Sequence, residues 1–196
     1  MVALPTSLQE ILWDGMSKAN VTSERAKTDT HFIVADPGVK REGGSLSNQN
    51  PNREVVHVAV GVLLREDGAF LLTSRPSGKP YAGYWEFPGG KFEPGETGEQ
   101  ALSRELLEEL GIDIDLKCTT QWRVQRVDYP HALVELHFYQ IRAFTGTLQT
   151  LEGQKLAWSQ LPVQVEPVLP GTVPVLEWFA LERGFKGPTH TQGSSS

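Results

Sequence analysis

Residues 90–112 read GKFEPGETGEQALSRELLEELGI, and they carry the clearest structural pattern in the sequence. Its first half is interrupted by glycine and proline, which is typical of a structured loop. Its second half predicts a helix over 97–110. Thr97 and Gln100 have the spacing of a capping box at the start of this helix, and Gly111 is a typical C-terminal stop. The sequence therefore predicts a loop that leads directly into a capped helix.

Three glutamates of this helix, Glu105, Glu108 and Glu109, lie at positions i, i+3 and i+4 and are expected to share one face. Like charges at this spacing destabilise an isolated helix by roughly a few tenths of a kcal/mol, and the last turn of a helix favours cations. Residues 93–115 hold eight of the 24 acidic residues and a single basic one, Arg104. A solvated acidic face is the ordinary explanation, and a bound hard cation such as Mg²⁺ is the alternative.

The wider spacing favours the cation. Five residues separate Gly90 from Glu96, seven more lead to Arg104, and the run then continues as RELLEELGI. This pattern resembles the Nudix box at every fixed position, and the chain resembles the Nudix hydrolases, which cleave nucleoside diphosphates linked to another moiety. The resemblance implies an α/β fold, an αβα sandwich with a mixed β-sheet between helices. Glu96, just before the helix, is expected to brace the loop.

The resemblance also implies a role for the residues that carry the chemistry. The carbonyl of Gly89 and the carboxylates of Glu105 and Glu109 are the expected metal ligands. Glu108 is expected beside them, as a further ligand or directly behind one, and Arg104 is expected to orient the glutamates. The implied cofactor is Mg²⁺, with Mn²⁺ as a substitute.

Residues 85–91, WEFPGGK, run into EPGE at 93–96 and resemble the MutT type of Nudix hydrolase, whose members hydrolyse oxidised guanine triphosphates. That type carries a further glutamate, a metal ligand and candidate general base, and Glu152 stands at its place. Arg75 stands at the place of a phosphate-contacting arginine, and Lys91 is a second phosphate candidate. The implied reaction is attack of water on the β-phosphorus of a nucleoside triphosphate, which releases a nucleoside monophosphate and pyrophosphate.

The residues that read the base are left open. MutT-type enzymes use an asparagine shortly before a Pro-Val pair, and related CTP pyrophosphohydrolases have an aspartate there, whereas this chain has Thr172. A hydroxyl lacks the planar donor and acceptor pair of an amide. The other candidates for substrate binding at this end are Glu86, Phe87, Tyr129 and His131.

Two substrate classes and one further class of function follow from this resemblance. Oxidised guanine nucleotides such as 8-oxo-dGTP, in nucleotide-pool sanitation, are the first expectation. CTP or modified cytosine nucleotides are the second. A catalytically silent Nudix domain that senses or binds nucleotides is the alternative from another class, and the complete set of box glutamates argues against it.

The sequence predicts one folded domain over 55–184, which includes the loop and helix above. Residues 1–54 are predicted to be a disordered extension and linker, and 185–196 a disordered tail, because segments this polar cannot offset the entropy of ordering the backbone. Within the domain the pattern predicts strands over 55–64, 69–75 and 156–158, a hairpin of 122–129 and 132–143, and a closing helix over 172–183.

Composition limits the remaining possibilities. The 196 residues carry a net charge of −6, which argues against broad electrostatic binding of nucleic acid. The single cysteine, Cys118, excludes an internal disulfide framework and a zinc site of several thiolates. Apolar runs such as 58–64 fall far short of the roughly 20 residues that cross a bilayer, and the N-terminus lacks the pattern of a secretory signal. We therefore expect a cytoplasmic protein that binds a nucleoside triphosphate but neither a membrane nor, stably, nucleic acid. Its oligomeric state is open, with a monomer as the working expectation.

Overall fold

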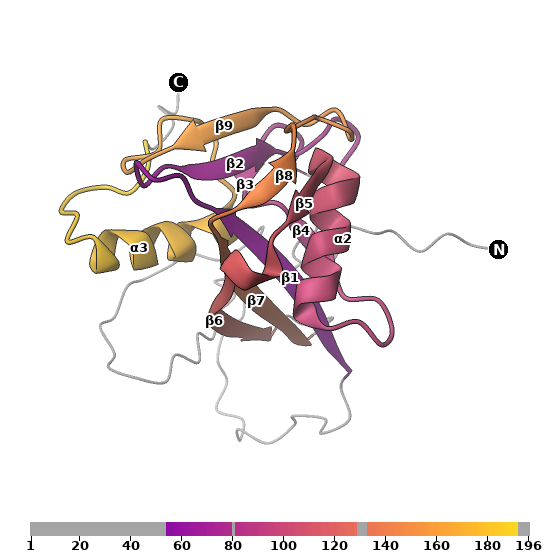
Figure 1. Cartoon of the computed structure of the whole chain (residues 1–196). Helices are drawn as coiled ribbons and strands as arrows, with labels where there is room; N and C mark the ends of the chain where they lie inside the picture. The colour runs from indigo at the N-terminus through magenta and orange to yellow at the C-terminus, as the bar shows by residue number, and fades with distance from the viewer. Residues whose placement is uncertain (1–53, 80, 129–132, 192–196) are drawn as a thin grey trace, which may run out of the picture.

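The computed structural model describes residues 54–79, 81–128 and 133–191 (Figure 1). The predictions made for 1–53, for Tyr129 and His131, and for the end of the tail lie outside these residues. The described elements are β1 Val55–Leu63, β2 Phe70–Ser74, β3 Trp85–Glu86, β4 Gly89–Lys91, α2 Gly98–Leu110, β5 Ile112–Ile114, a 3₁₀ turn Leu116–Cys118, β6 Thr119–Asp128, β7 Leu133–Ile141, β8 Phe144–Gly146, β9 Leu156–Ser159, a 3₁₀ turn Pro170–Thr172 and α3 Val173–Glu182.

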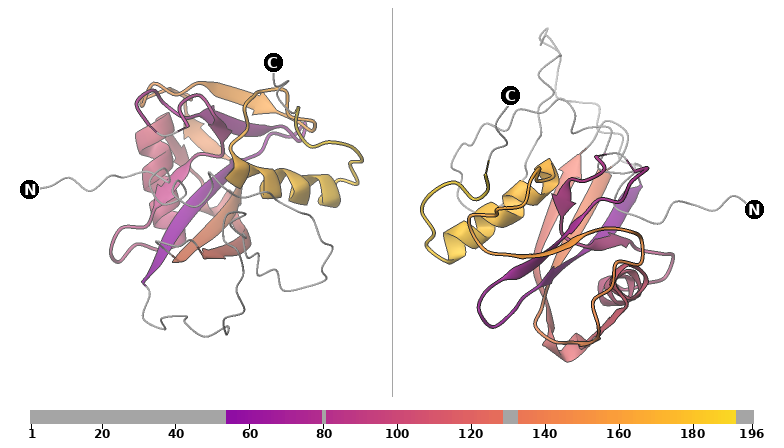
Figure 2. Two further views of the ribbon diagram at one scale, coloured as in Figure 1. Left: turned by 180° about the vertical axis from the view of Figure 1, so that it is seen from behind. Right: turned by 90° about the horizontal axis from the view of Figure 1, so that it is seen from above.

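The main sheet has the strand order β4-β1-β7-β6. It is mixed, because β1 and β7 run parallel while the β1–β4 and β6–β7 pairs are antiparallel. Strand β1 is apolar on both of its faces, which is typical of a strand that is covered on two sides. Figures 1 and 2 show α2 on one face of this sheet and α3 on the other. The predicted α/β sandwich with a mixed sheet between helices is confirmed.

Alternate residues of β1 face two separate apolar cores. Val58, Val60 and Val62 pack with the buried face of α3, where Val175, Leu176 and Phe179 lie as predicted. Ala59 and Leu63 pack with the apolar face of α2, whose buried members are Ala101, Leu102, Leu106 and Leu110. This second core holds α2 against the sheet next to β4.

The ends of α2 follow the predicted pattern. The Thr97 side chain accepts a hydrogen bond from the backbone of Gln100, and the Gln100 side chain accepts one from the backbone of Thr97, which completes the capping box. Gly111 ends the helix in the left-handed region, with φ of 68°. The closing helix begins at Val173 rather than at Thr172, because Pro170–Thr172 forms a 3₁₀ turn ahead of it.

Four short strands, β3, β4, β5 and β8, were not predicted. Two of them, β3 and β4, lie inside the segment 81–96 that the sequence predicts as loop, and β5 pairs with β8 in a small sheet of its own. Strands of two or three residues carry too little periodicity to be recognised, and they form because longer neighbours pair with them. A second sheet has the order β3-β2-β9 and lies beside the main one. No helix of the described part is long and apolar enough to cross a bilayer.

Candidate active site

Two glycines bring the backbone of β4 into contact with α2 and β1. Gly89 has φ of 144°, and a Cβ on it would overlap the carbonyl oxygen of Ala59. A Cβ on Gly90 would overlap the carboxyl group of Glu105. Only glycine permits this approach, so the carboxylates of α2 lie directly against the bare backbone of the loop.

The three box glutamates differ in burial. Glu105 and Glu109 are 2% and 8% exposed, and the Glu109 Oε2 accepts a hydrogen bond of 3.3 Å from the Gly89 N–H. The side chain of Glu108 is 53% exposed. At 3.6 residues per turn, Glu109 is rotated about 40° around the helix axis from Glu105, and Glu108 about 60° in the opposite direction. The Glu109 side is buried, and Glu108 lies at the edge. The three therefore lie on one face of about 100°, as predicted, but only Glu105 and Glu109 are buried.

Arg104 fixes the Glu105 carboxylate and the loop together. Its Nη1 donates to Glu105 Oε1 at 2.8 Å, and its Nε and Nη2 donate to the two carboxylate oxygens of Glu96 at 2.8 and 3.0 Å. Nη2 also donates to the carbonyl of Lys91, whereas the contact with Glu108 is longer, at 3.5 Å. The hydrogen bond from Arg104 holds the pKa of Glu96 below its usual value. Glu96 thus braces the loop, as expected, with a second bond from the Glu93 N–H.

Burial makes the two inner carboxylates costly to ionise. It raises the pKa of Glu105 to about 7, although Arg104 acts in the opposite direction. It also raises the pKa of Glu109 well above its usual value, and the nearby charges of Glu105 and Glu152 add to this shift. An all-oxygen set of buried carboxylates beside a bared backbone fits a hard divalent cation, whose charge would offset their repulsion.

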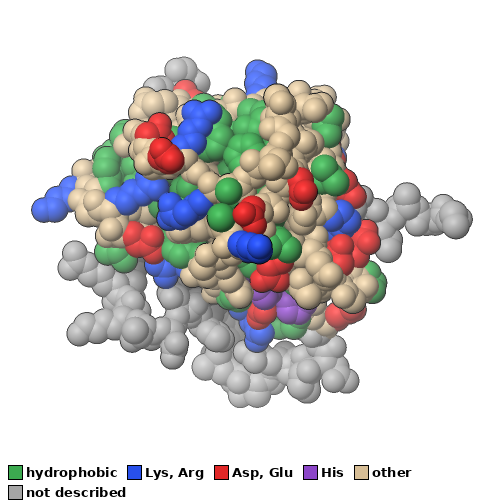
Figure 3. Space-filling view, in the orientation of Figure 1, with side chains coloured by type: hydrophobic (Ala, Val, Ile, Leu, Met, Phe, Trp, Pro, Cys, Tyr) green, Lys and Arg blue, Asp and Glu red, His purple; other side chains and the backbone are tan. Residues whose placement is uncertain are grey.

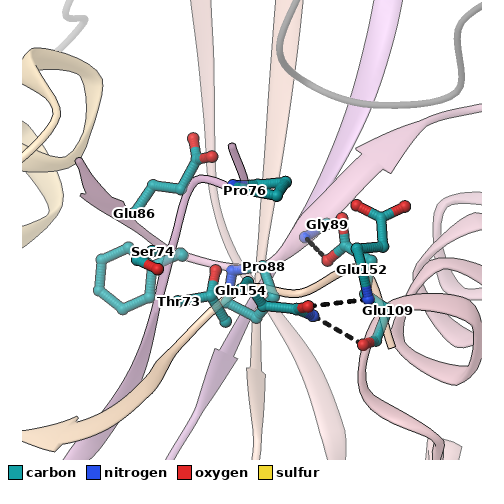
Figure 4. Close-up of a pocket in the computed structure, with 10 residues that line it drawn as sticks. Thr73, Ser74, Pro76, Glu86, Pro88, Gly89, Glu109, Glu152 and Gln154 are labelled. Atoms are coloured by element: carbon teal, nitrogen blue, oxygen red, sulfur yellow. Dashed lines mark hydrogen bonds between the residues drawn. The ribbon is translucent and has the colours of Figure 1, made fainter. Parts of the chain in front are cut away.

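Glu152 reaches the same place from the loop before β9. Its backbone N–H donates to Gln154 Oε1 at 2.9 Å, and Gln154 Nε2 donates to the Glu109 carbonyl at 2.7 Å. Gln154 is buried, and it ties the loop to the end of α2 (Figure 4). The Glu152 carboxylate is 4.0 Å from the Lys79 ammonium group. Gln154 and Lys79 were missed by the sequence analysis: Gln154 stands in the run EGQ beside Glu152, and Lys79 belongs to no motif.

These residues line one pocket. Figure 4 shows Glu109 and Glu152 on one side of it and Glu86 across from them. The pocket is lined by Thr73, Ser74, Pro76, Glu86, Phe87, Pro88, Gly89, Glu109, Glu152 and Gln154. The loop, the C-terminal part of α2 and the segment before β9 therefore meet at a single acidic pocket.

Residues 55–183, two thirds of the chain, match the NUDIX domain family. The chain belongs to the Nudix hydrolase family. It is 39% identical over 121 residues to the CTP pyrophosphohydrolase of Escherichia coli, a match that covers 61% of this chain and 88% of that one. It is also 39% identical over 107 residues to the 8-oxo-dGTP diphosphatase of Haemophilus influenzae, which covers 55% of this chain and 77% of the relative.

The same fold is found among solved structures. The solution structure of the E. coli ORF135 protein is 35% identical, with a TM-score of 0.57, and the likeness covers 67% of this chain and 92% of that one. The chain is thus a Nudix hydrolase of the MutT type, and its predicted family and fold are confirmed.

Across the pocket of this Nudix hydrolase, Arg75 and Glu86 form a buried ion pair. Arg75 Nη1 lies 3.0 and 3.1 Å from the two carboxylate oxygens of Glu86. Burial raises the pKa of Glu86 to about 7, and the Arg75 charge acts against this shift. Both residues were predicted to bind substrate, and the structure places them together at the end of β2 and in β3. Those roles stay predictions.

The predicted base end is built from different elements. Thr172 is buried, and its hydroxyl donates to the Trp85 carbonyl at 3.4 Å. That carbonyl also accepts the Leu169 N–H at 2.9 Å. Phe87 is 3% exposed and packs against Phe70 in the α3-side core, so its side chain is mainly structural. A second hollow beside β3 is lined by Ser74, Gly83, Trp85, Lys155, Val165 and Glu166.

The structure therefore brings together most of the residues predicted for metal and phosphate. Gly89, Glu109 and Glu152 line the pocket, and Glu105 lies against the neighbouring backbone of Gly90. Lys91 ends β4 and is partly exposed, next to the loop that Arg104 holds. Thr172 does not line this pocket, and its hydroxyl contacts the Trp85 backbone carbonyl instead. The catalytic and binding roles of all these residues stay predictions.

Proposed function

We propose that this Nudix hydrolase is a Mg²⁺-dependent nucleoside triphosphate pyrophosphohydrolase that converts a nucleoside triphosphate and water into a nucleoside monophosphate and pyrophosphate. The observation that carries the proposal is the burial of Glu105 and Glu109 against the glycine backbone of β4, with Glu152 brought to the same pocket. Buried carboxylates in this arrangement are costly to the fold unless a cation joins them.

The residues at the metal side of the pocket have distinct roles in this proposed reaction. Glu105, Glu109 and the Gly89 carbonyl would hold Mg²⁺, which supplies charge neutralisation and Lewis-acid activation at the polyphosphate when it is bound. Arg104 keeps the Glu105 carboxylate in place through its 2.8 Å hydrogen bond. Glu152, on a loop and partly exposed, can accept the proton of the attacking water.

Two cations, Arg75 and Lys79, lie close enough to Glu86 or Glu152 to be candidates for contact with the phosphate chain. The Lys79 ammonium group lies 4.0 Å from the Glu152 carboxylate, and its positive charge acts to lower the pKa of Glu86. Arg75 is held in a fixed orientation by Glu86. A triphosphate bound between these groups and the metal end would present its phosphoryl centre to the water that Glu152 activates.

The first candidate substrate is 8-oxo-dGTP or a related oxidised guanine nucleotide, in sanitation of the cytoplasmic nucleotide pool. The run WEFPGGK at 85–91 supports it, as does the likeness to the Haemophilus influenzae protein named 8-oxo-dGTP diphosphatase. Such an activity would remove oxidised nucleotides before they are used in DNA replication.

The second candidate substrate is CTP or a modified cytosine nucleotide. The Escherichia coli relative named CTP pyrophosphohydrolase supports it, because that match extends over 88% of the relative. Thr172 favours neither candidate, because it replaces both the asparagine expected for oxidised guanine and the aspartate expected for cytosine nucleotides.

A panel of ordinary and oxidised nucleoside triphosphates, scored by pyrophosphate release with and without Mg²⁺, tests the proposal. We expect release that requires Mg²⁺ and is fastest with 8-oxo-dGTP. Faster turnover of CTP or 5-modified dCTP than of any guanine nucleotide would select the second candidate. No release from any member of the panel would contradict the proposed activity and favour a nucleotide-binding module.

A further inference from the structure

A second group of metal-ligating side chains lies on the main sheet, outside the Nudix box. His57 belongs to β1, and Glu135 and His137 belong to β7. In the parallel register of these strands His57 is opposite Glu135, and Ala59 is opposite His137. Residues of one strand separated by two positions point to the same face, so all three side chains project on one side of the sheet.

That side is the one covered by α2. Ala59 and Tyr139 are the next residues on this face of β1 and β7, and they pack in the core beneath the helix. The start of α2 lies over Tyr139, since a Cβ on Gly98 would overlap the Tyr139 hydroxyl. The three ligating residues are therefore in the part of this face that the helix leaves open, and all three are partly exposed. Figure 3 shows histidine side chains at the surface with acidic side chains directly beside them.

The geometry of the three ligating atoms matches a metal site. His57 Nδ1 lies 3.1 Å from His137 Nε2 and 3.5 Å from Glu135 Oε1, and His137 Nε2 lies 3.2 Å from the same Glu135 oxygen. A tetrahedral zinc ion with bonds of about 2.05 Å has ligand atoms about 3.3 Å apart. The triangle therefore has the size of one face of a zinc tetrahedron.

Neighbouring side chains hold the triangle in place. Arg126 donates through Nε to Glu135 Oε2 at 3.0 Å, which leaves Oε1 directed at both imidazoles. Gln121 Nε2 lies 3.3 Å from His137 Nδ1, and a 180° flip of this amide would place its Oε1 to accept a hydrogen bond from that nitrogen. The Phe92 ring packs against both imidazoles, with centroids 5.6 and 5.2 Å away. Such partners orient ligands in metal sites.

We propose that His57, Glu135 and His137 form a binding site for a divalent transition-metal ion, with zinc as the reference ion. Two imidazole nitrogens and one carboxylate oxygen suit Zn²⁺ and Cu²⁺, whereas the box offers oxygen ligands alone and suits Mg²⁺. The partly exposed His57 leaves room for water or another small ligand at a fourth position. A bound ion would join β1 to β7, the central pair of the main sheet. The site is independent of the proposed hydrolase activity.

Copper binding gives the sharpest test, because nitrogen ligands identify the site. One equivalent of Cu²⁺ is added to chelator-treated full-length protein in excess Mg²⁺, and its electron paramagnetic resonance spectrum is recorded. We expect coupling to two imidazole nitrogens. His57→Ala and His137→Ala should each remove this two-nitrogen signal, while His190→Ala, a change at a histidine outside the triangle, should preserve it. Survival of the signal in both triangle variants would contradict the proposal.

Zinc affinity, measured by competition with a chromophoric chelator, provides the quantitative test. We expect His57→Ala to weaken binding by at least about tenfold and Glu105→Gln to leave it unchanged. Zinc should also raise the thermal midpoint of the wild-type protein and not that of His57→Ala. His57 is the most exposed of the three ligands, so this variant is expected to fold, as circular dichroism can check. Wild-type protein that binds no zinc at micromolar free concentrations would overturn the proposal, and the triangle would then be a hydrogen-bonded network only.

Discussion

The two ends of the proposed substrate site, the metal end at Glu105 and Glu109 and the base end at Thr172, differ in how firmly the chain fixes them. At the metal end, Glu105 and Glu109 project from a capped helix, touch glycine backbone and are held by Arg104 and Gly89. At the base end, Thr172 lies in a 3₁₀ turn, and its hydroxyl donates a hydrogen bond to the Trp85 backbone carbonyl. The residues proposed for phosphate chemistry thus lie on regular structure, whereas the residue proposed to read the base lies in a turn, where sequence change is tolerated.

The largest expected effect is at the metal end. Glu105→Gln keeps the shape of the side chain but removes a buried charge that a divalent cation requires. We expect turnover at saturating Mg²⁺ to fall by at least roughly 10²-fold, as when other preorganised electrostatic contacts are removed. Pyrophosphate release measures it.

Glu108→Gln is the matched control, because the Glu108 side chain is half exposed and lies at the edge of the cleft. We expect a smaller loss of turnover in this variant than in Glu105→Gln. Equal losses would show that burial does not determine how much each box glutamate contributes to turnover. Near-normal turnover in Glu105→Gln would contradict the special role given to the metal end.

The next effect concerns the residue that positions the metal end. Arg104→Gln breaks the hydrogen bonds to Glu105, Glu96 and the Lys91 carbonyl. We expect turnover to fall by about 10- to 100-fold and the Mg²⁺ concentration for half-maximal activity to rise. Arg142→Gln, at an exposed arginine, serves as the control and should change neither quantity. A fall in turnover with an unchanged Mg²⁺ dependence would contradict a positioning role.

A smaller effect is expected at the base end. Thr172→Asn supplies an amide in place of a hydroxyl. We expect the ratio of kcat/KM for 8-oxo-dGTP over CTP to rise by roughly tenfold, within the range for a paired hydrogen-bond contact to a base. Thr172→Ser, which keeps the hydroxyl, should leave that ratio unchanged. If the asparagine variant loses turnover of both substrates equally, Thr172 acts on the fold and not on the base.

The smallest effect is on stability, and Glu105 at the metal end contributes to it. Glu105 has a pKa of about 7 in the folded protein against an ordinary value of 4.5. As the pH rises between these values, the unfolded chain gives up a proton that the folded protein retains, so the free energy of unfolding falls and then stays level above pH 7.

Urea unfolding in EDTA at pH 5 and pH 8 measures this dependence. We expect the metal-free protein to be less stable at pH 8, Mg²⁺ to recover part of the loss, and Glu105→Gln to show a weaker dependence on pH. A variant with the wild-type pH dependence would assign the effect to other groups.

Sequence alone predicts the parts of this molecule that depend on local spacing. The capping box at Thr97 and the stop at Gly111 follow from local patterns at the two ends of α2. The clustering of Glu105 and Glu109 at the loop follows from the same spacing.

Features that join distant segments could not be predicted in this way. The Arg75–Glu86 pair depends on the pairing of β2 with β3, and Gln154 meets Glu109 only because the loop before β9 folds back on α2. His57 and His137 are 80 residues apart in sequence and meet through the register of two parallel strands. No local pattern encodes a register of this kind.

Direct measurement of metal binding tests the central claim, that buried carboxylates of α2 bind the catalytic cation. Free Mn²⁺ is followed by electron paramagnetic resonance during titration of the wild-type protein, Glu109→Gln and Glu108→Gln. We expect the tight Mn²⁺ site of the wild type to be lost in Glu109→Gln and preserved in Glu108→Gln. Wild-type affinity in Glu109→Gln would contradict the claim.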